Sequence, residues 1–105
     1  MGVIAKTPAP PYYAVIFTSL RTQGDNGYSS MAEEMVDLAV EQPGFLGVES
    51  VREELGITIS YWKDMESIVQ WKNDPRHQKA QQLGRSKWYG SFKVRVVKVE
   101  RDSEF

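Results

Sequence analysis

Residues 12–21, which read YYAVIFTSLR, decide the fold of this chain. The stretch is rich in aromatic and β-branched residues, which favour an extended backbone. Its apolar side chains stand at both odd and even positions, and successive side chains of a strand point to opposite faces. We therefore predict a strand over residues 12–21 that is covered on both of its faces.

A helix is predicted to follow this strand. Turn-forming residues fill positions 23–27, and Pro43-Gly44 forms a natural stop. Between them, apolar side chains recur at helical spacing, which predicts a helix over residues 28–42 with one apolar face. That face consists of Tyr28, Met31, Ala32, Met35, Leu38 and Ala39.

Two strand-like runs come next, over residues 45–53 and 56–62, and only a short turn separates them. The simplest interpretation is an antiparallel hairpin. In its second strand, alternation places Ile57, Ile59 and Tyr61 on one face. The other face of that strand then carries Thr58, Ser60 and Trp62.

The pattern becomes helical again over residues 65–84, but Pro75 interrupts it. A proline either breaks a helix or begins a new one at its first turn, so we expect two short helices or one kinked helix. Alternating apolar residues over 92–101 predict a last strand.

The order strand, helix, strand, strand, helix, strand predicts an α+β, ferredoxin-like domain with a four-stranded antiparallel sheet. We expect this domain over residues 12–101, after an extended, proline-containing arm (1–11) and before a short tail (102–105). Helices cover only one face of such a sheet. We expect a second copy to cover the other face, which gives a homodimeric α/β barrel.

Composition narrows the possible partners and chemistry. The 13 basic and 14 acidic residues are interspersed, so no basic stripe predicts binding of nucleic acid. The absence of cysteine excludes thiolate chemistry and Cys-ligated zinc, and a single histidine argues against a metal site. No apolar stretch approaches the ~20 residues of a membrane helix. We expect a cytoplasmic protein without membrane contact.

Several polar residues allow more than one interpretation. His77 is the natural candidate for a general base because its side chain ordinarily titrates near neutral pH, but it is also a plausible structural hydrogen-bonding residue. Gly84-Arg85-Ser86-Lys87 is either a contact for an anionic group or a helix stop with exposed charge. Glu49 and Arg52 are interpreted as a solvated strand edge that could hold ion pairs.

The chain resembles the antibiotic-biosynthesis-monooxygenase family of small dimeric α/β barrels. The similarity lies in the hairpin stretches 42–50 and 56–63, and it continues through Trp71-Lys72, His77, Ala80-Gln81, Gly84-Arg85, Trp88-Tyr89 and the closing Val99-Glu100-Arg101. Together these motifs span about residues 12–101. The family includes enzymes, haem degraders and members without an assigned activity.

Two functions follow from the resemblance. The first is a cofactor-independent monooxygenase that oxidises a small aromatic or polyketide-like compound with O₂. The alternative is a non-catalytic dimeric module that binds a small apolar molecule or acts through protein contacts. Haem degradation is disfavoured, because Gln81 stands where those relatives carry the axial histidine and the first strand lacks their asparagine.

The resemblance also implies roles for individual residues of a pocket between helices and sheet. His77 is the candidate catalytic residue, with neither metal nor cofactor expected. An apolar aromatic ligand would be held by the walls and polar contacts Trp62, Trp71, Trp88, Tyr89, Ser60 and Arg85. The three tryptophans are equally interpretable as ordinary core residues, because aromatic side chains carry much of the burial in a small domain.

Overall fold

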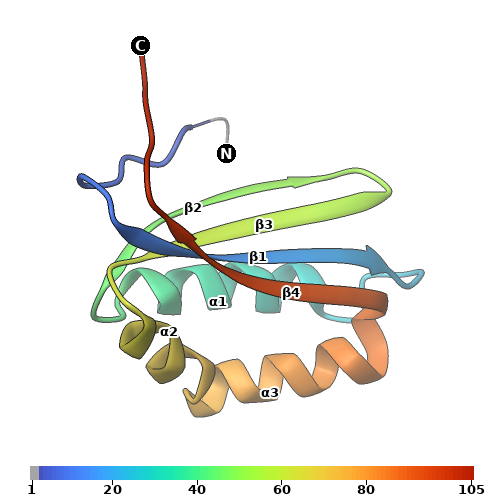
Figure 1. The fold of residues 1–105 in the computed structure, drawn as a ribbon. Helices are drawn as coiled ribbons and strands as arrows, with labels where there is room; N and C mark the ends of the chain where they lie inside the picture. The colour runs from blue at the N-terminus through green and yellow to red at the C-terminus, as the bar shows by residue number, and fades with distance from the viewer. Residues whose placement is uncertain (1–2) are drawn as a thin grey trace.

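A four-stranded antiparallel sheet carries all of the α-helices on one face (Figure 1). The computed structural model describes residues 3–105, and within them no helix is long and apolar enough to cross a membrane. The predicted ferredoxin-like α+β fold is confirmed. The elements in chain order are β1 (Tyr12–Arg21), α1 (Tyr28–Val40), β2 (Phe45–Arg52), β3 (Leu55–Trp62), α2 (Met65–Lys72), α3 (Pro75–Leu83), the π-helical turn η1 (Gly84–Trp88) and β4 (Tyr89–Val99).

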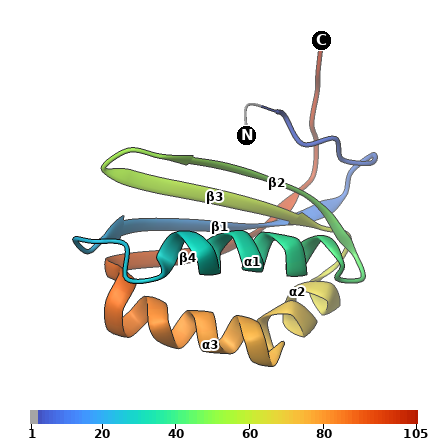
Figure 2. The same ribbon diagram turned by 180° about the vertical axis from the view of Figure 1, so that it is seen from behind.

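The strands lie in the order β2-β3-β1-β4, so β1 is central and pairs with both β3 and β4. Val15 lies opposite Ser60 of β3 on one side and Val96 of β4 on the other. Residues that share such a row point to the same face. We call the face toward the helices the inner face and the opposite one the outer face (Figure 2).

A bulge shifts the register of β2. Phe45 pairs with Trp62, but Gly47 already pairs with Tyr61, so one extra residue is accommodated between Phe45 and Gly47. A bulge of this kind reverses the odd–even pattern beyond it. Phe45 and the later residue Arg52 therefore both belong to the inner face, although alternation without a bulge would separate them.

The break predicted at Pro75 is confirmed, because α2 and α3 are two separate helices with their own caps. The Asp64 carboxylate accepts a hydrogen bond from the Ser67 amide at 2.8 Å and so caps α2. Asp74 caps α3 by accepting from the amides of Arg76 (2.9 Å) and His77 (3.3 Å), and Pro75 occupies the first turn. The amides of the first helical turn have no partner within the helix, so the missing N–H of a proline costs nothing there.

Some element boundaries differ from the prediction. Helix α1 ends at Val40 rather than at residue 42, because the next two amides bond to carbonyls only three residues back. Strand β4 runs from Tyr89 to Val99 rather than over 92–101, because its pairing with β1 extends from Arg21 back to Tyr12. The tertiary pairing therefore sets the ends of β4.

The main core lies between the inner face and the first two helices. Trp62 is fully buried, and its ring packs edge-on against Phe45 and stacks on Trp71. Leu38, Ala39 and Ile68 complete this core cluster. Helix α3, in contrast, contributes no buried residue. The helical layer is therefore tightly packed on the sheet at the Trp62 end only.

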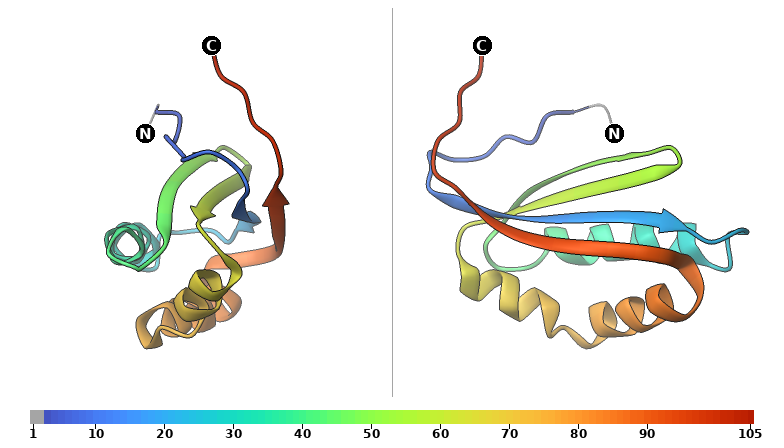
Figure 3. Two further views of the ribbon diagram at one scale, coloured as in Figure 1. Left: turned by 60° about the vertical axis from the view of Figure 1, so that its left-hand side comes forward. Right: turned by 45° about the vertical axis from the view of Figure 1, so that its right-hand side comes forward.

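The two chain ends lie on the outer face (Figure 3). Residues 3–11 form no helix or strand, and the first two residues of the arm lie outside the described part of the chain. The Ala5 amide donates to Glu49 at 2.9 Å, and the Tyr12 hydroxyl donates to Asp102 at 2.5 Å. Arm and tail therefore cover one end of the outer face.

Two glycines with positive φ provide a test of the turns. Gly27 (φ 84°) has open space where a Cβ would stand, whereas at Gly44 (φ 82°) a Cβ would meet the buried side chain of Ser67. We expect Gly27→Ala to lower the free energy of unfolding by about 1–2 kcal/mol through backbone strain alone. Gly44→Ala should cost clearly more, about 3 kcal/mol or above, because it also displaces Ser67 from the α2 cap.

Urea unfolding of both variants beside the wild type measures this difference. Equal losses for the two glycines would contradict the close approach of Gly44 to Ser67.

Candidate functional site

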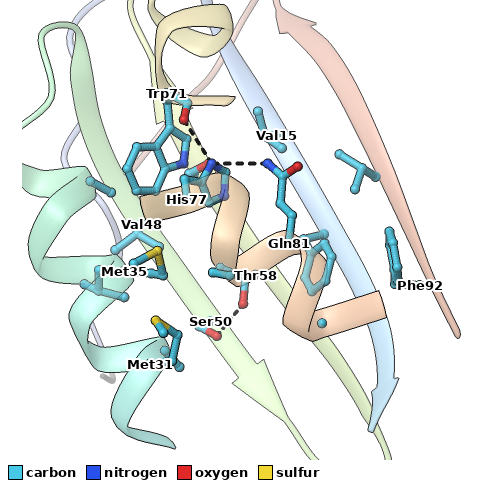
Figure 4. Close-up of a pocket in the computed structure, with 18 of the residues that line it drawn as sticks. Val15, Met31, Met35, Val48, Ser50, Thr58, Trp71, His77, Gln81 and Phe92 are labelled. Atoms are coloured by element: carbon cyan, nitrogen blue, oxygen red, sulfur yellow. Dashed lines mark hydrogen bonds between the residues drawn. The ribbon is translucent and has the colours of Figure 1, made fainter. Parts of the chain in front are cut away.

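A cavity of about 730 Å³ lies between the inner face of the sheet and helices α1 and α3 (Figure 4). The helical wall of the cavity, which we call the roof, consists of the apolar face of α1 and one side of α3; the sheet forms the opposite wall, which we call the floor. The roof side chains include Met31 and Met35 from α1 and His77, Ala80 and Gln81 from α3. The apolar face predicted for α1 thus lines a space large enough for a small molecule.

The floor of the cavity has two halves of different polarity. On β2 and β3 it includes three hydroxyl side chains, Ser50, Thr58 and Ser60, and the Ser50 and Thr58 oxygens lie 2.8 Å apart. On β1 and β4 every lining side chain except that of Tyr89 is purely hydrocarbon. A flat ligand on this floor would meet hydrogen-bonding groups along one edge and hydrocarbon along the other.

The cavity opens beside β4. Val94 and Val96 line it and yet remain 50% and 46% exposed. Strand β4 is the edge strand of the sheet, and the lower layer in Figure 1 leaves this edge uncovered. A ligand would therefore enter between β4 and α3.

His77 stands in the first turn of α3 on the cavity wall, and its ring stacks on Trp71 with centroids 4.1 Å apart. The Nδ1 atom lies 3.0 Å from the Trp71 carbonyl oxygen. Because a carbonyl only accepts, this shorter contact places the proton on Nδ1 and leaves the lone pair on Nε2. The Gln81 amide nitrogen, 3.4 Å from the same Nδ1, then cannot donate to it. Nε2 has no hydrogen-bond partner among residues 3–105. Every buried side-chain nitrogen in that part of the chain has a partner, so Nε2 is not buried and remains accessible.

Burial lowers the pKa of His77 below its ordinary value of 6.5, against the smaller opposing effects of the Trp71 carbonyl and Asp74. The neutral imidazole is therefore the form present at pH 7. A neutral ring with a fixed tautomer and an accessible lone pair has the properties of a general base.

The end of the cavity away from Trp71 is an aromatic cluster. Tyr89 packs edge-on against Phe17 (5.0 Å between centroids) and Tyr28 (5.8 Å), and Trp88 is buried beside Tyr28. Burial, together with the Tyr28 hydroxyl, raises the pKa of Tyr89 far above its ordinary value. The Tyr89 hydroxyl thus stays protonated and can donate a hydrogen bond at any physiological pH.

The structure brings most of the candidate residues to one cavity. The candidates that line it are Ser60, Trp71, His77, Arg85, Trp88 and Tyr89. Arg85 lines it from the turn η1, for which the sequence left open a contact with an anionic group or a helix stop with exposed charge. Trp62 is not among the lining residues, because it is fully enclosed between Phe45 and Trp71.

Arg52 is a lining residue that the sequence analysis missed. Glu49 and Arg52 were interpreted as one solvated edge, which is wrong: Glu49 lies on the outer face, where it accepts from Tyr61 at 2.6 Å, and Arg52 points inward to Ser19. Alternation alone places Glu49 and Arg52 on opposite faces, and the bulge after Phe45 decides that Arg52 is the one that points inward. The signal available in the sequence was the alternation of Val48, Ser50 and Arg52 against the outward set beginning with Glu49.

No three His, Cys, Asp or Glu side chains within residues 3–105 are grouped closely enough to hold a metal ion. The groups on the cavity wall that can act on a ligand are an imidazole, hydroxyls, a side-chain amide, two guanidinium groups, the Lys72 ammonium and the Glu33 carboxylate. These can take up a proton and stabilise a negative oxygen.

Comparison with known proteins identifies relatives. Residues 11–83 match the family model described as antibiotic biosynthesis monooxygenase. The uncharacterized protein YqjZ of Bacillus subtilis (strain 168) is 55% identical over 107 residues, which cover 100% of this chain and 94% of the relative.

Two solved structures are also similar. A variant of SnoaB, a cofactor-independent oxygenase from Streptomyces nogalater, superposes with a TM-score of 0.75 at 13% identity, over 87% of this chain and 95% of that chain. A conserved protein from Methanosarcina mazei Go1 gives 0.74 at 11% identity, over 83% and 91% of the two chains. At these identities the structures establish a shared fold.

The lowered pKa of His77 predicts a pH dependence. Between the folded pKa and the unfolded value of about 6.5, the unfolded chain binds more protons than the folded one. The contribution of His77 to stability is therefore complete above pH 6.5, and it is lost as the pH falls through the folded pKa. Since His77 is the only histidine, its imidazole proton signals can be followed by NMR without assignment.

We expect a midpoint below 6.5 in this titration, and a loss of stability on acidification that is smaller in His77→Gln. A midpoint at or above 6.5 would contradict the burial of the ring.

Proposed function

Because this chain belongs to the antibiotic biosynthesis monooxygenase family, we propose that it is a cofactor-independent monooxygenase that oxidises a small aromatic or polyketide-like compound with O₂. The observation that carries the proposal is the accessible Nε2 of a neutral His77 on the wall of a large, mostly apolar cavity. The relative SnoaB, described as a cofactor-independent oxygenase, has the same fold.

The proposed reaction balances without a further reactant. His77 Nε2 removes a proton from an activated CH₂ group of the substrate, and the resulting carbanion is delocalised onto a neighbouring oxygen. The substrate then supplies four electrons to O₂. One oxygen atom becomes the new carbonyl, the other leaves as water, and CH₂ plus O₂ gives C=O plus H₂O.

The cavity supports this chemistry in two ways. Its apolar walls exclude water, which strengthens the interaction of hydrogen-bond donors with a developing oxyanion. The donors available include the protonated Tyr89 and the guanidinium of Arg85. Trp71 supports the stacked imidazole and provides a flat wall for an aromatic ligand.

Oxygen consumption with anthrone, a tricyclic ketone with an activated CH₂, tests the proposal. We expect turnover above the spontaneous rate, and a decrease of about 10²–10⁴-fold in His77→Gln, in the range usual for loss of a general base. The exposed Lys79→Gln on the same helix is the control and should keep full activity.

A folded His77→Gln variant with wild-type turnover would remove this residue from the mechanism. Absence of oxygen consumption across a series of such ketones, with binding retained, would instead support a non-catalytic binding module.

We further propose a homodimer in which the outer faces of two sheets pack together. Arm and tail cover only one end of this face, and apolar side chains remain in the open: Leu20 is 46% and Leu55 50% exposed, and they are cross-strand partners. Val97 on β4 points to the same face and is 38% exposed. A continuous apolar surface of this kind usually marks a protein interface.

A charge placed in that surface should prevent association. We expect Leu20→Lys to be monomeric by light scattering at concentrations where the wild type is a dimer. Val40→Lys is the matched control, because Val40 is similarly exposed (57%) but lies at the end of α1. A dimeric Leu20→Lys, or a monomeric wild type at high concentration, would contradict the proposed interface.

A further inference from the structure

Arg52 is held at one end of the cavity by contacts on the sheet. It is the last residue of β2, and its Nη2 and Nη1 atoms donate to the Oγ and the carbonyl oxygen of Ser19, the latter at 3.4 Å. Both residues are register partners of Gly56. The guanidinium occupies the place that a Cβ of Gly56 would take, so the absence of a side chain there makes room for it.

The charge of Arg52 has no acidic partner among residues 3–105. Both of its hydrogen bonds within residues 3–105 go to Ser19, which is only 2% exposed and neutral. These bonds use two of the five N–H donors of a guanidinium. A half-buried cation that lines a mostly apolar cavity, with donors to spare, is a favourable position for a ligand oxyanion.

The hydroxyl half of the floor leads to this cation. Along the paired strands β2 and β3 the inward positions are Ser60 with Val48, then Thr58 with Ser50, then Arg52 opposite Gly56, so β3 supplies a hydroxyl at each of the first two levels. Successive inward positions of a strand are about 6.5–7 Å apart. The three levels therefore span the length of a fused aromatic ring system, with hydroxyls along one edge and the guanidinium at the end.

The groups around Arg52 suit the same ligand. The ring of Tyr89 is near enough for the charges of Arg52 and Arg21 to act on its hydroxyl, and Arg21 itself is engaged over the Tyr28 ring at 3.6 Å. Phe17 and Phe92 provide hydrocarbon on the other half of the floor. Arg52 and Arg85 both line the cavity at this end, but Arg85 is exposed on η1, whereas Arg52 is half-buried and held in place by Ser19.

We propose that Arg52 binds an acidic oxygen group of the ligand, and that the natural ligand is an elongated aromatic compound with oxygen substituents along one edge and an oxyanion at its end. This inference rests on the proposed function only in placing a ligand in the cavity. It adds the ligand's charge and orientation: the anionic end lies at Arg52, and the opposite end lies toward His77 and Trp71.

Two fluorescent probes of equal shape test this assignment: anthracene-2-carboxylate and anthracene-2-carboxamide, titrated at pH 7. We expect the wild type to bind the carboxylate at least 10-fold more tightly than the amide. Arg52→Met should reduce this ratio to within about twofold, chiefly by weakening the binding of the carboxylate. Lys79→Met removes an exposed positive charge outside the cavity and should keep the wild-type ratio.

The outcomes separate the two proposals. If the wild type binds both probes equally, or if Arg52→Met keeps the 10-fold preference, Arg52 is not the anion site, although the cavity still accepts aromatic ligands. If the wild type binds neither probe, the aromatic-binding cavity of the proposed function is overturned as well.

Circular dichroism establishes whether Arg52→Met is folded. If it is not, Arg52→Lys decides the question: a point charge without the planar fork should lower the carboxylate preference at least threefold, and an unchanged preference would overturn the proposal.

Discussion

The register of β1 with its two neighbours is the constraint that organises this molecule. Side chains alternate across a sheet, so one choice of pairing assigns every residue of β1, β3 and β4 to a face. With Val15 opposite Ser60 and Val96, hydrocarbon and hydroxyl groups meet in the same rows of the inner face. Both the floor of the cavity and the apolar outer face follow from this register.

The cavity exists because large side chains hold the layers apart at its ends. Trp62 and Trp71 stack at one end, and Trp88 and Tyr89 pack with Tyr28 at the other. Between them the helices present the small side chains of Ala32 and Ala80 and the flexible ones of Met31 and Met35. Helix α3 is placed by its cap and by the turns on either side rather than by burial, since it has no buried residue. A cavity therefore remains between the sheet and the helices, while the core around Trp62 stays packed.

Within this space the polar groups have separate tasks. The Trp71 carbonyl fixes the tautomer of His77 and leaves Nε2 free, while burial keeps the ring neutral. At the far end Ser19 fixes Arg52, whose charge stays available. A ligand bound between a neutral base and a fixed cation is oriented before any chemistry begins, and this orientation lowers the entropic part of the activation barrier. Apolar side chains that stay exposed lie on the outer face, where a second copy is proposed to bind.

The sequence by itself determined the order of the elements, the helix break at Pro75, the apolar face of α1 and the two faces of β3. All of these depend on local rules: residue periodicity, capping and the fixed φ of proline. Most of the site residues that it indicated do line the cavity. Tertiary structure alone decided that Trp62 is enclosed and that Arg52 points inward. Enclosure depends on packing against residues distant in the chain, and a single bulge after Phe45 reverses the alternation of β2. Alternation along β2 separates Glu49 from Arg52, but it does not say which of the two faces the helices, and it says nothing of enclosure.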